Sequence, residues 1–162
     1  MCSISGFLKF GNQPYPKLDR ITDIILKGQD RGRDSFGYVI FNENRNPRRF
    51  RHIGPAEEIL NYSNPFGSSS EGDYLLLNNN RAEPTTEFVK NKQLSDVQPY
   101  SAGDTWIVHN GTIANDKELI EKYGLHLETK IDSAVIPHIF EKSDYTPESI
   151  IDILQNGLIG SY

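Results

Sequence analysis

Short apolar segments bounded by turn residues occupy much of the chain, and segments with helical periodicity dominate its C-terminal part. No apolar run approaches the roughly 18–20 residues of a membrane span, so several small elements must bury their apolar faces against one another. One helix is expected early, since Leu18, Ile21 and Ile25 have helical spacing within residues 17–29. The alternation of strands and helices in blocks predicts an α+β or layered α/β fold. The expected strands are residues 3–10, 36–41, 48–52, 73–79 and 104–109, and the third is expected to pair with the second across the Asn-rich turn of residues 42–47.

Three more helices are expected after residue 114, each with a signal at its start. Asn115 and Glu118 resemble a capping box, in which two side chains bond to the free backbone N–H groups of the first turn. The next helix begins at Asp132 or Ser133, and Pro137, past its first turn, should bend it. The third helix has an N-cap residue, a proline at its first position and an Asn-Gly stop. These residues are Thr146, Pro147, Asn156 and Gly157.

Size and charge exclude several classes of protein. The 162 residues suit one domain, and a hydrophobic share of 36% with 10% aromatic residues supports a real core. The net charge is -5, so we expect no general attraction to nucleic acid or to anionic membranes. The start of the chain lacks a basic leader followed by an apolar stretch, which favours a cytoplasmic protein.

Cofactor signals are weak. The one cysteine excludes an internal disulfide and a cysteine-rich zinc site, and the four histidines lack metal-ligand spacing. The sequence has no Gly-x-Gly-x-x-Gly pattern, so it gives no sign of a nucleotide-phosphate site. We therefore expect no metal and no cofactor. The arginines of residues 45–51 are interpreted as a solvated hairpin, with partner docking as the less favoured alternative. A Gly/Ser-rich stretch over residues 64–72 is expected to be a surface loop within one domain.

Cys2 is notable for its position. Removal of Met1 would leave a residue that carries both a thiol and a free α-amine. An α-amine has a pKa near ~7.7–8.0 and a thiol near ~8.5, so the pair combines a base and a nucleophile at neutral pH. A cysteine at position two is more often incidental, but a strand that begins at Ser3 would hold this terminus rigidly.

Two further segments allow a structural and a functional interpretation. The run from Asp30 to Gly37 is either a charged turn or a rigid turn that fixes an arginine and an aspartate near the chain start. Asn110-Gly111 follows a strand and is typical of a hairpin turn. The alternative is an oxyanion hole, in which the Asn110 amide and the Gly111 N–H donate to a developing negative oxygen.

Arg81 and Asp132 also leave two interpretations open. Arg81 ends a strand and Asp132 begins a helix. In the structural interpretation, Arg81 is a surface cation and Asp132 is an N-cap. Together they offer one charge of each sign, which is what binding of a free amino acid requires.

The order of these motifs along the chain resembles the class II glutamine amidotransferase domain. This is the N-terminal-nucleophile glutaminase unit of glucosamine-6-phosphate synthase, amidophosphoribosyltransferase and asparagine synthetase. The resemblance covers residues 2–133, and Gln98-Pro99-Tyr100 is similar to the asparagine synthetase branch. The matching residues are Cys2-Ser3-Ile4-Ser5-Gly6, Arg31-Gly32-Arg33-Asp34-Ser35-Phe36-Gly37, Arg81, His109-Asn110-Gly111-Thr112-Ile113-Ala114-Asn115 and Asp132-Ser133.

The resemblance implies a four-layer αββα sandwich and hydrolysis of the glutamine side-chain amide to glutamate and ammonia. It implies Cys2 as nucleophile with its α-amine as base, and Asn110 and Gly111 as the oxyanion hole. Arg81 would bind the carboxylate of L-glutamine and Asp132 its amino group. Arg31 would support the N-terminus. The implied partner is a synthetase domain or subunit that accepts the ammonia.

The sequence departs from this family in two places. Residues 82–86 lack the aromatic or histidine-containing glutamine loop of the family. Residues 158–162 resemble the start of a core strand at which the chain stops, so we expect one glutaminase domain over residues 1–162 with its C-terminal strands incomplete. Two other functions stay open, namely an N-terminal-nucleophile amidase acting on another amide and a truncated, non-catalytic binding domain.

Overall fold

The computed structural model describes residues 2–11, 17–42, 46–63, 73–83 and 90–161. It is a mixed fold of helices and antiparallel sheets, in agreement with the predicted α+β class. The chain divides into two compact units, Met1–Pro99 and Tyr100–Tyr162, which are described separately below. The expected four-layer sandwich and the expected single domain over residues 1–162 stay predictions.

The first unit is built on a four-stranded antiparallel sheet with the order β1-β4-β2-β3. The strands predicted at residues 36–41, 48–52 and 73–79 are confirmed, whereas the first strand ends at Leu8 rather than at Phe10. The strand predicted at residues 104–109 is shorter and covers only Thr105–Ile107. The predicted pairing of residues 48–52 with residues 36–41 is also confirmed, because β2 and β3 are neighbours in register. The strands are β1 (Ser3–Leu8), β2 (Ser35–Asn42), β3 (Pro47–Ile53) and β4 (Asp73–Arg81).

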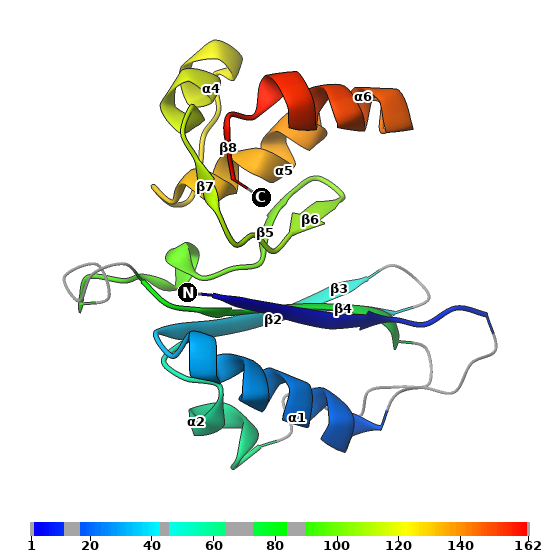
Figure 1. Ribbon diagram of the computed structural model, residues 1–162, viewed down its shortest axis with the longest axis vertical. Coiled ribbons are helices and arrows are strands. Elements are labelled where there is room, and N and C mark those ends of the chain that lie inside the picture. The colour runs from blue at the N-terminus through cyan, green and yellow to red at the C-terminus, as the bar shows by residue number, and fades with distance from the viewer. Residues whose placement is uncertain (1, 12–16, 43–45, 64–72, 84–89, 162) are drawn as a thin grey trace. The chain divides into compact units, whose positions relative to one another are not determined.

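Helices cover one face of this sheet, as Figure 1 shows for α1 (Leu18–Gly28) and α2 (Glu57–Leu60). Ile21 and Ile25 of α1 lie one helical turn apart and are buried. They pack against alternate residues of the strands, because side chains two positions apart share a face of a sheet. The sheet residues of this core are Phe36, Tyr38, Ile40 and Leu76.

Two short turns complete the described part of the first unit. The 3-10 turn η1 (Gln29–Arg31) continues α1 toward β2, and a second 3-10 turn, η2 (Leu94–Asp96), precedes Val97. Arg48 and Arg49 of β3 are exposed, as expected for a solvated hairpin, but Arg51 donates a hydrogen bond to the Pro99 carbonyl at 2.8 Å. Arg45 and the Gly/Ser-rich stretch lie outside the described residues.

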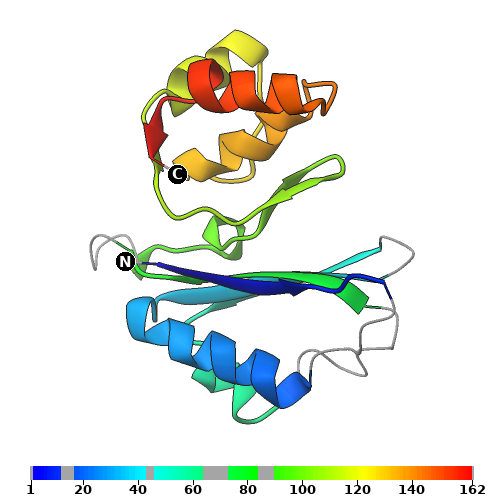
Figure 2. The same ribbon diagram turned by 45° about the vertical axis from the view of Figure 1, so that its right-hand side comes forward.

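The second unit contains two small antiparallel pairs and several helices, which Figure 2 shows from a second direction. Strands β5 (Tyr100–Ala102) and β6 (Thr105–Ile107) form a hairpin, and β7 (Thr112–Ile113) pairs with β8 (Gly160–Ser161). The helices are α4 (Asp116–Tyr123), η3 (Asp132–Ala134), α5 (Val135–Phe140), α6 (Pro147–Asp152) and the π-helical turn η4 (Ile153–Gly157). Their shared core is Ile113, Leu119, Val135, Ile136, Ile139 and Leu158.

The helix signals of the sequence had mixed outcomes. Thr146 caps α6 by accepting a hydrogen bond from the Ser149 N–H, as predicted. The capping box at Asn115 is wrong, because the Asn115 side chain makes no cap hydrogen bond and binds the chain at residues 157–159 instead. The helical start predicted at Asp132 or Ser133 is confirmed by η3, but Pro137 does not lie past the first turn of the α-helical part. The α-helix begins at Val135, so Pro137 falls in its first turn, where a missing N–H has little effect.

Among the described helices, none combines the length and the apolar character that crossing a bilayer requires.

Candidate functional site

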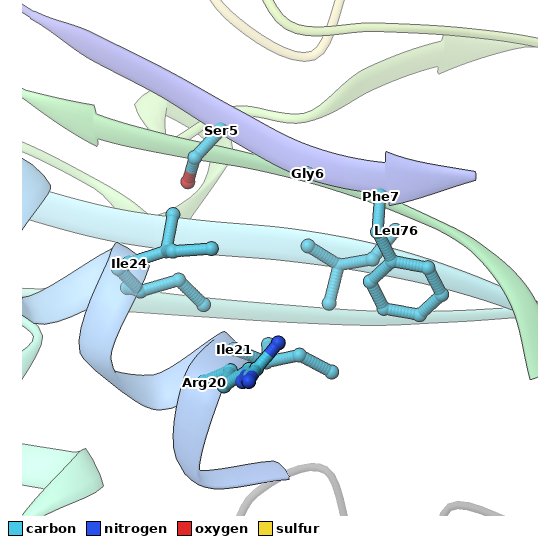
Figure 3. Close-up of a pocket in the computed structure, with 8 residues that line it drawn as sticks. Ser5, Gly6, Phe7, Arg20, Ile21, Ile24 and Leu76 are labelled. Atoms are coloured by element: carbon cyan, nitrogen blue, oxygen red, sulfur yellow. The ribbon is translucent and has the colours of Figure 1, made fainter. Parts of the chain in front are cut away.

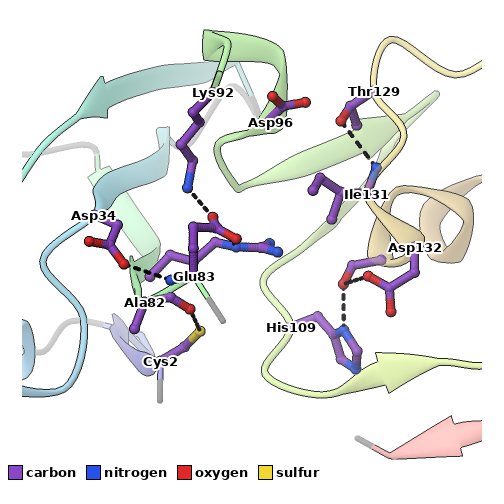
Figure 4. Close-up of polar contacts among 12 residues, drawn as sticks. Cys2, Asp34, Ala82, Glu83, Lys92, Asp96, His109, Thr129, Ile131 and Asp132 are labelled. Atoms are coloured by element: carbon purple, nitrogen blue, oxygen red, sulfur yellow. Dashed lines mark hydrogen bonds and ion pairs between the residues drawn. The ribbon is translucent and has the colours of Figure 1, made fainter. Parts of the chain in front are cut away.

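The pairing of β1 with β4 brings Cys2 next to the end of β4. Ser3 is opposite Asn80 in the register, and Cys2 precedes Ser3 directly. The Cys2 thiol is half-buried and lies 3.8 Å from the Ala82 carbonyl oxygen, to which it donates a weak hydrogen bond (Figure 4). The structure therefore brings two of the predicted site residues, Cys2 and Arg81, close together in the sheet.

The Asp30–Gly37 turn fixes the same segment from the other side. The backbone N–H of Asp34 donates to the Arg81 carbonyl at 2.9 Å, and its carboxylate accepts from the Glu83 N–H at 2.6 Å. Gly32 lies so close to β4 that a Cβ there would be 2.5 Å from the Asn80 carbonyl oxygen. The turn thus positions residues 81–83. Arg31 lies beside Gly32 and is exposed.

Buried charges surround the end of β4. The side chains of Glu83 and Lys92 have no exposed area and form an ion pair through Glu83 Oε1 and Lys92 Nζ (Figure 4). Arg81 Nε lies 2.8 Å from the same Glu83 oxygen, although its N–H is not aligned for a hydrogen bond. Burial lowers the pKa of Lys92, and the hydrogen bond to Glu83 opposes that shift. We call Asp34, Arg81, Glu83 and Lys92 the Glu83 cluster.

Glu83 and Lys92 were not found by sequence reasoning. Residues 82–86 drew attention only for lacking an aromatic residue or a histidine, and nothing in the sequence around Lys92 indicates a buried cation. A lysine is rarely buried unless it is paired with an acidic side chain. The burial of Lys92 could therefore be inferred only once its contact with Glu83 was known.

In the second unit, one chain of hydrogen bonds connects Asp132, a predicted site residue, with Ser133 and His109 of the matching motifs. His109 is buried, with Nδ1 2.8 Å from Ser133 Oγ and Nε2 2.9 Å from the Ser161 carbonyl oxygen. Ser133 Oγ is 3.3 Å from Asp132 Oδ1, and Asp132 Oδ2 accepts from the Ile113 N–H at 2.6 Å. Figure 4 includes these side chains. We call His109, Ser133 and Asp132 the His109 chain.

The tautomer of His109 follows from these partners. A carbonyl oxygen only accepts, so Nε2 must carry the proton that goes to Ser161. Nδ1 lies 2.8 Å from Ser133 Oγ, and the Ser133 hydroxyl is also within hydrogen-bond distance of Asp132 Oδ1.

Asn110-Gly111 is not a hairpin turn. The strand before it, β6, pairs with β5, and the strand after it, β7, pairs with β8. Asn110 is exposed, and Gly111 passes so close to β8 that a Cβ would be 2.0 Å from the Ser161 carbonyl oxygen. The hairpin interpretation is wrong, and the oxyanion hole stays a prediction.

The apolar cavity of the first unit does not contain these residues. A space of about 120 Å³ lies between β1 and α1, with Phe7, Ile21 and Leu76 in its lining (Figure 3). It lies on the helix-covered face of the sheet, and neither Cys2 nor Arg81 lines it. No group of three or more His, Cys, Asp and Glu side chains among the described residues is arranged to hold a metal ion.

Comparison with known proteins points to one family. The model of the glutamine amidotransferase domain family matches residues 86–161. A 7-cyano-7-deazaguanine synthase from Saccharolobus solfataricus is 42% identical over 161 residues, which cover 96% of this chain and 33% of the synthase. The protein of the same name from Sulfolobus acidocaldarius is 35% identical over 164 residues, with 100% of this chain and 35% of the synthase covered.

More distant relatives carry a second name. A glutamine–fructose-6-phosphate aminotransferase (isomerizing) from Vibrio parahaemolyticus is 26% identical over 144 residues, covering 83% of this chain and 22% of the aminotransferase. The chain thus spans 33–35% of the length of the two synthases above and less of the aminotransferase.

Proposed function

The chain belongs to the glutamine amidotransferase family, and from this premise we propose that it hydrolyses the side-chain amide of L-glutamine and releases ammonia for a synthetase domain or partner. The observation that carries this proposal is the β1–β4 register, which puts the Cys2 thiol beside the segment of Arg81, Ala82 and Glu83. A nucleophile next to a cation suits a substrate with an amide at one end and a carboxylate at the other.

In the proposed reaction, Met1 is removed and the free α-amine of Cys2 takes the thiol proton. The thiolate attacks the amide carbon of glutamine, and a C–S bond forms. The protonated α-amine gives its proton to the leaving nitrogen, the C–N bond breaks and ammonia departs. Water then hydrolyses the thioester to glutamate and regenerates the thiol.

The other site residues have roles in this proposal that follow from their chemistry. Asn110 and Gly111 donate to the oxygen of the tetrahedral intermediate. Arg81 binds the α-carboxylate, and Asp132 binds the α-ammonium. Arg31 supports the N-terminus from its place in the Asp30–Gly37 turn. The fold expected for this chemistry is the αββα sandwich, and the expected compartment is the cytoplasm.

We also propose a destination for the ammonia. Two relatives with 42% and 35% identity are named for the synthesis of 7-cyano-7-deazaguanine, a compound whose cyano group contains one nitrogen atom. We propose that the acceptor of the ammonia is the synthase that forms this product. Glutamine labelled with ¹⁵N in its amide should transfer the label to the cyano group, and unlabelled product would point to another acceptor.

The experiment that tests the proposed hydrolysis uses the cysteine itself. The chain has one cysteine, so a glutamine analogue with an electrophile at the amide position should add once, at Cys2, as read by intact mass. Cys2→Ala should lose both the adduct and measurable glutamate release, because no other thiol can replace the nucleophile. Glutamate release retained in Cys2→Ala would exclude a Cys2 thioester.

A further inference from the structure

Glu83 and Lys92 of the Glu83 cluster have no role in the proposed reaction, although both side chains are completely buried. Burying a carboxylate and an ammonium removes each from water, and apolar side chains of similar size often stabilise a fold as well or better. The pair is therefore poorly explained by stability alone. Its position next to Arg81 gives another explanation.

Arg81 presents two edges. Its Nε edge lies 2.8 Å from Glu83 Oε1, and 14% of its side chain is exposed. A guanidinium is planar and rigid, so a charge held at the Nε edge sets the direction of the two terminal nitrogens. Those nitrogens are the part of an arginine that binds a carboxylate bidentately.

Glu83 alone would have an unfavourable second effect, since its negative charge would cancel the positive charge that a substrate carboxylate needs. Lys92 removes this conflict. It is paired with the same Glu83 oxygen, so the charges of Glu83 and Lys92 cancel each other, while the carboxylate of Asp34 makes the whole Glu83 cluster neutral. Glu83 can then orient Arg81 without neutralising it.

We propose that Glu83 and Lys92 are positioning residues that aim Arg81 at the α-carboxylate of the substrate. Glu83 holds the Nε edge, and Lys92 holds Glu83 and balances its charge. This inference rests on the proposed function, in which Arg81 binds that carboxylate. Backbone bonds keep the frame in place, because Asp34 ties residues 81 and 83 through two hydrogen bonds.

The test compares two ligands that differ in one group. L-glutamine has the α-carboxylate, and 4-aminobutanamide is the same molecule without it. In the full chain, Glu83→Gln keeps the size of the side chain and removes its charge. We expect the Kd of L-glutamine, measured by calorimetry, to rise about ten-fold, and the Kd of 4-aminobutanamide to stay unchanged.

A matched control exists in the same unit. Glu57 pairs with Arg33, but the two side chains are 38% and 51% exposed. Glu57→Gln therefore makes the same chemical change in an exposed pair, where an ion pair contributes little, and should leave both Kd values unchanged. If Glu83→Gln does not fold, as read by circular dichroism, the double variant Glu83→Gln/Lys92→Met removes both buried charges and should show the same selective loss.

The outcomes separate this inference from the proposed function. Equal Kd values for L-glutamine in the wild-type chain and in Glu83→Gln would overturn the inference alone. Equal weakening of both ligands would also overturn it, because a merely structural role does not discriminate between them. A wild-type chain that binds L-glutamine but releases no glutamate would overturn the proposed hydrolysis and leave the binding test valid. A wild-type chain that does not bind L-glutamine would overturn both.

Discussion

The two units differ in how completely their buried polar side chains are paired. In the described part of the first unit, Ser35 Oγ, both amide atoms of Asn79, Asn80 Oδ1 and Glu83 Oε2 are buried and make no hydrogen bond, and Arg81 Nε has an ion pair only. In the second unit, no such atom occurs within residues 100–161. There each of the three side chains of the His109 chain has a hydrogen-bond partner.

Three of these residues lie together, whereas Asn80 faces α1, where its amide nitrogen donates to the Ile25 carbonyl. Ser35 is opposite Arg81 and Gly37 is opposite Asn79, so Ser35, Asn79 and Arg81 share one face of the sheet at its Cys2 end. An unmade hydrogen bond of a buried group is unfavourable by about 1–3 kcal/mol. A polar ligand can supply the hydrogen-bond partners that such buried atoms lack. The proposed glutamine site lies at this same end of β4.

The largest expected effect tests whether the second unit is already arranged for chemistry. Asn110→Ala should lower kcat by roughly 10²–10³, or about 2.7–4 kcal/mol, because one oxyanion donor is lost. KM and the midpoint of thermal unfolding should hardly change, since Asn110 is exposed. Steady-state kinetics and circular dichroism check both.

Asn156→Ala is the control for Asn110→Ala, because Asn156 is an exposed asparagine of the same unit. It should leave kcat unchanged. A rise in KM with constant kcat in Asn110→Ala would mean that Asn110 binds the ground state of the substrate rather than the oxyanion.

The next prediction concerns stability and gives opposite signs in the two units. Asn79→Leu replaces a buried, unpaired amide by an apolar side chain of the same branched shape and should stabilise the chain by about 1 kcal/mol. Ser133→Ala leaves His109 Nδ1 without its partner and should destabilise it by about 1–3 kcal/mol. Urea unfolding followed by circular dichroism measures both.

Changes of equal sign would break the comparison between the units. If Asn79→Leu destabilises the chain, its amide has a partner in solution or leucine is too large for the site. Asn79→Ala separates these two cases, because alanine removes the amide without adding volume.

The elements of the fold that depend on neighbouring residues were predictable from the sequence. The spacing of Ile21 and Ile25 predicted α1, the Asn-rich turn predicted the β2–β3 hairpin, and Thr146 predicted the cap of α6. The order β1-β4-β2-β3 was not predictable in this way. It places β4 between two strands that precede it in the chain, and no local pattern encodes such a pairing.

The candidate site divides in the same manner. Cys2, Arg81, Asn110, Gly111 and Asp132 were found from the order of motifs and the resemblance that this order supports, and their roles stay predictions. Glu83 and Lys92 were missed, because burial of a charge depends on contacts that only the folded chain makes. At Asn110-Gly111 the local turn preference gave the wrong pairing, since β8 pairs with β7 in place of β6.

The smallest effect that we predict separates the capping box expected at Asn115 from the contacts found there. Asn115 Nδ2 donates to the Gly157 carbonyl at 3.0 Å, and Oδ1 accepts from the Ile159 N–H at 2.9 Å. Asn115→Asp keeps a good N-cap residue and adds a negative charge at a helix N-terminus, so a capping role predicts unchanged or higher stability. In the structure the same change loses the donor and places a carboxylate against the Gly157 carbonyl, so we expect a loss of about 1 kcal/mol in the free energy of unfolding.

Asp116→Asn, one position along in the first turn of α4, is the control for the charge and should lose only a few tenths of a kcal/mol through the helix dipole. Urea unfolding of the two variants and the wild type measures the difference, and an Asn115→Asp chain more stable than the wild type would restore the capping box.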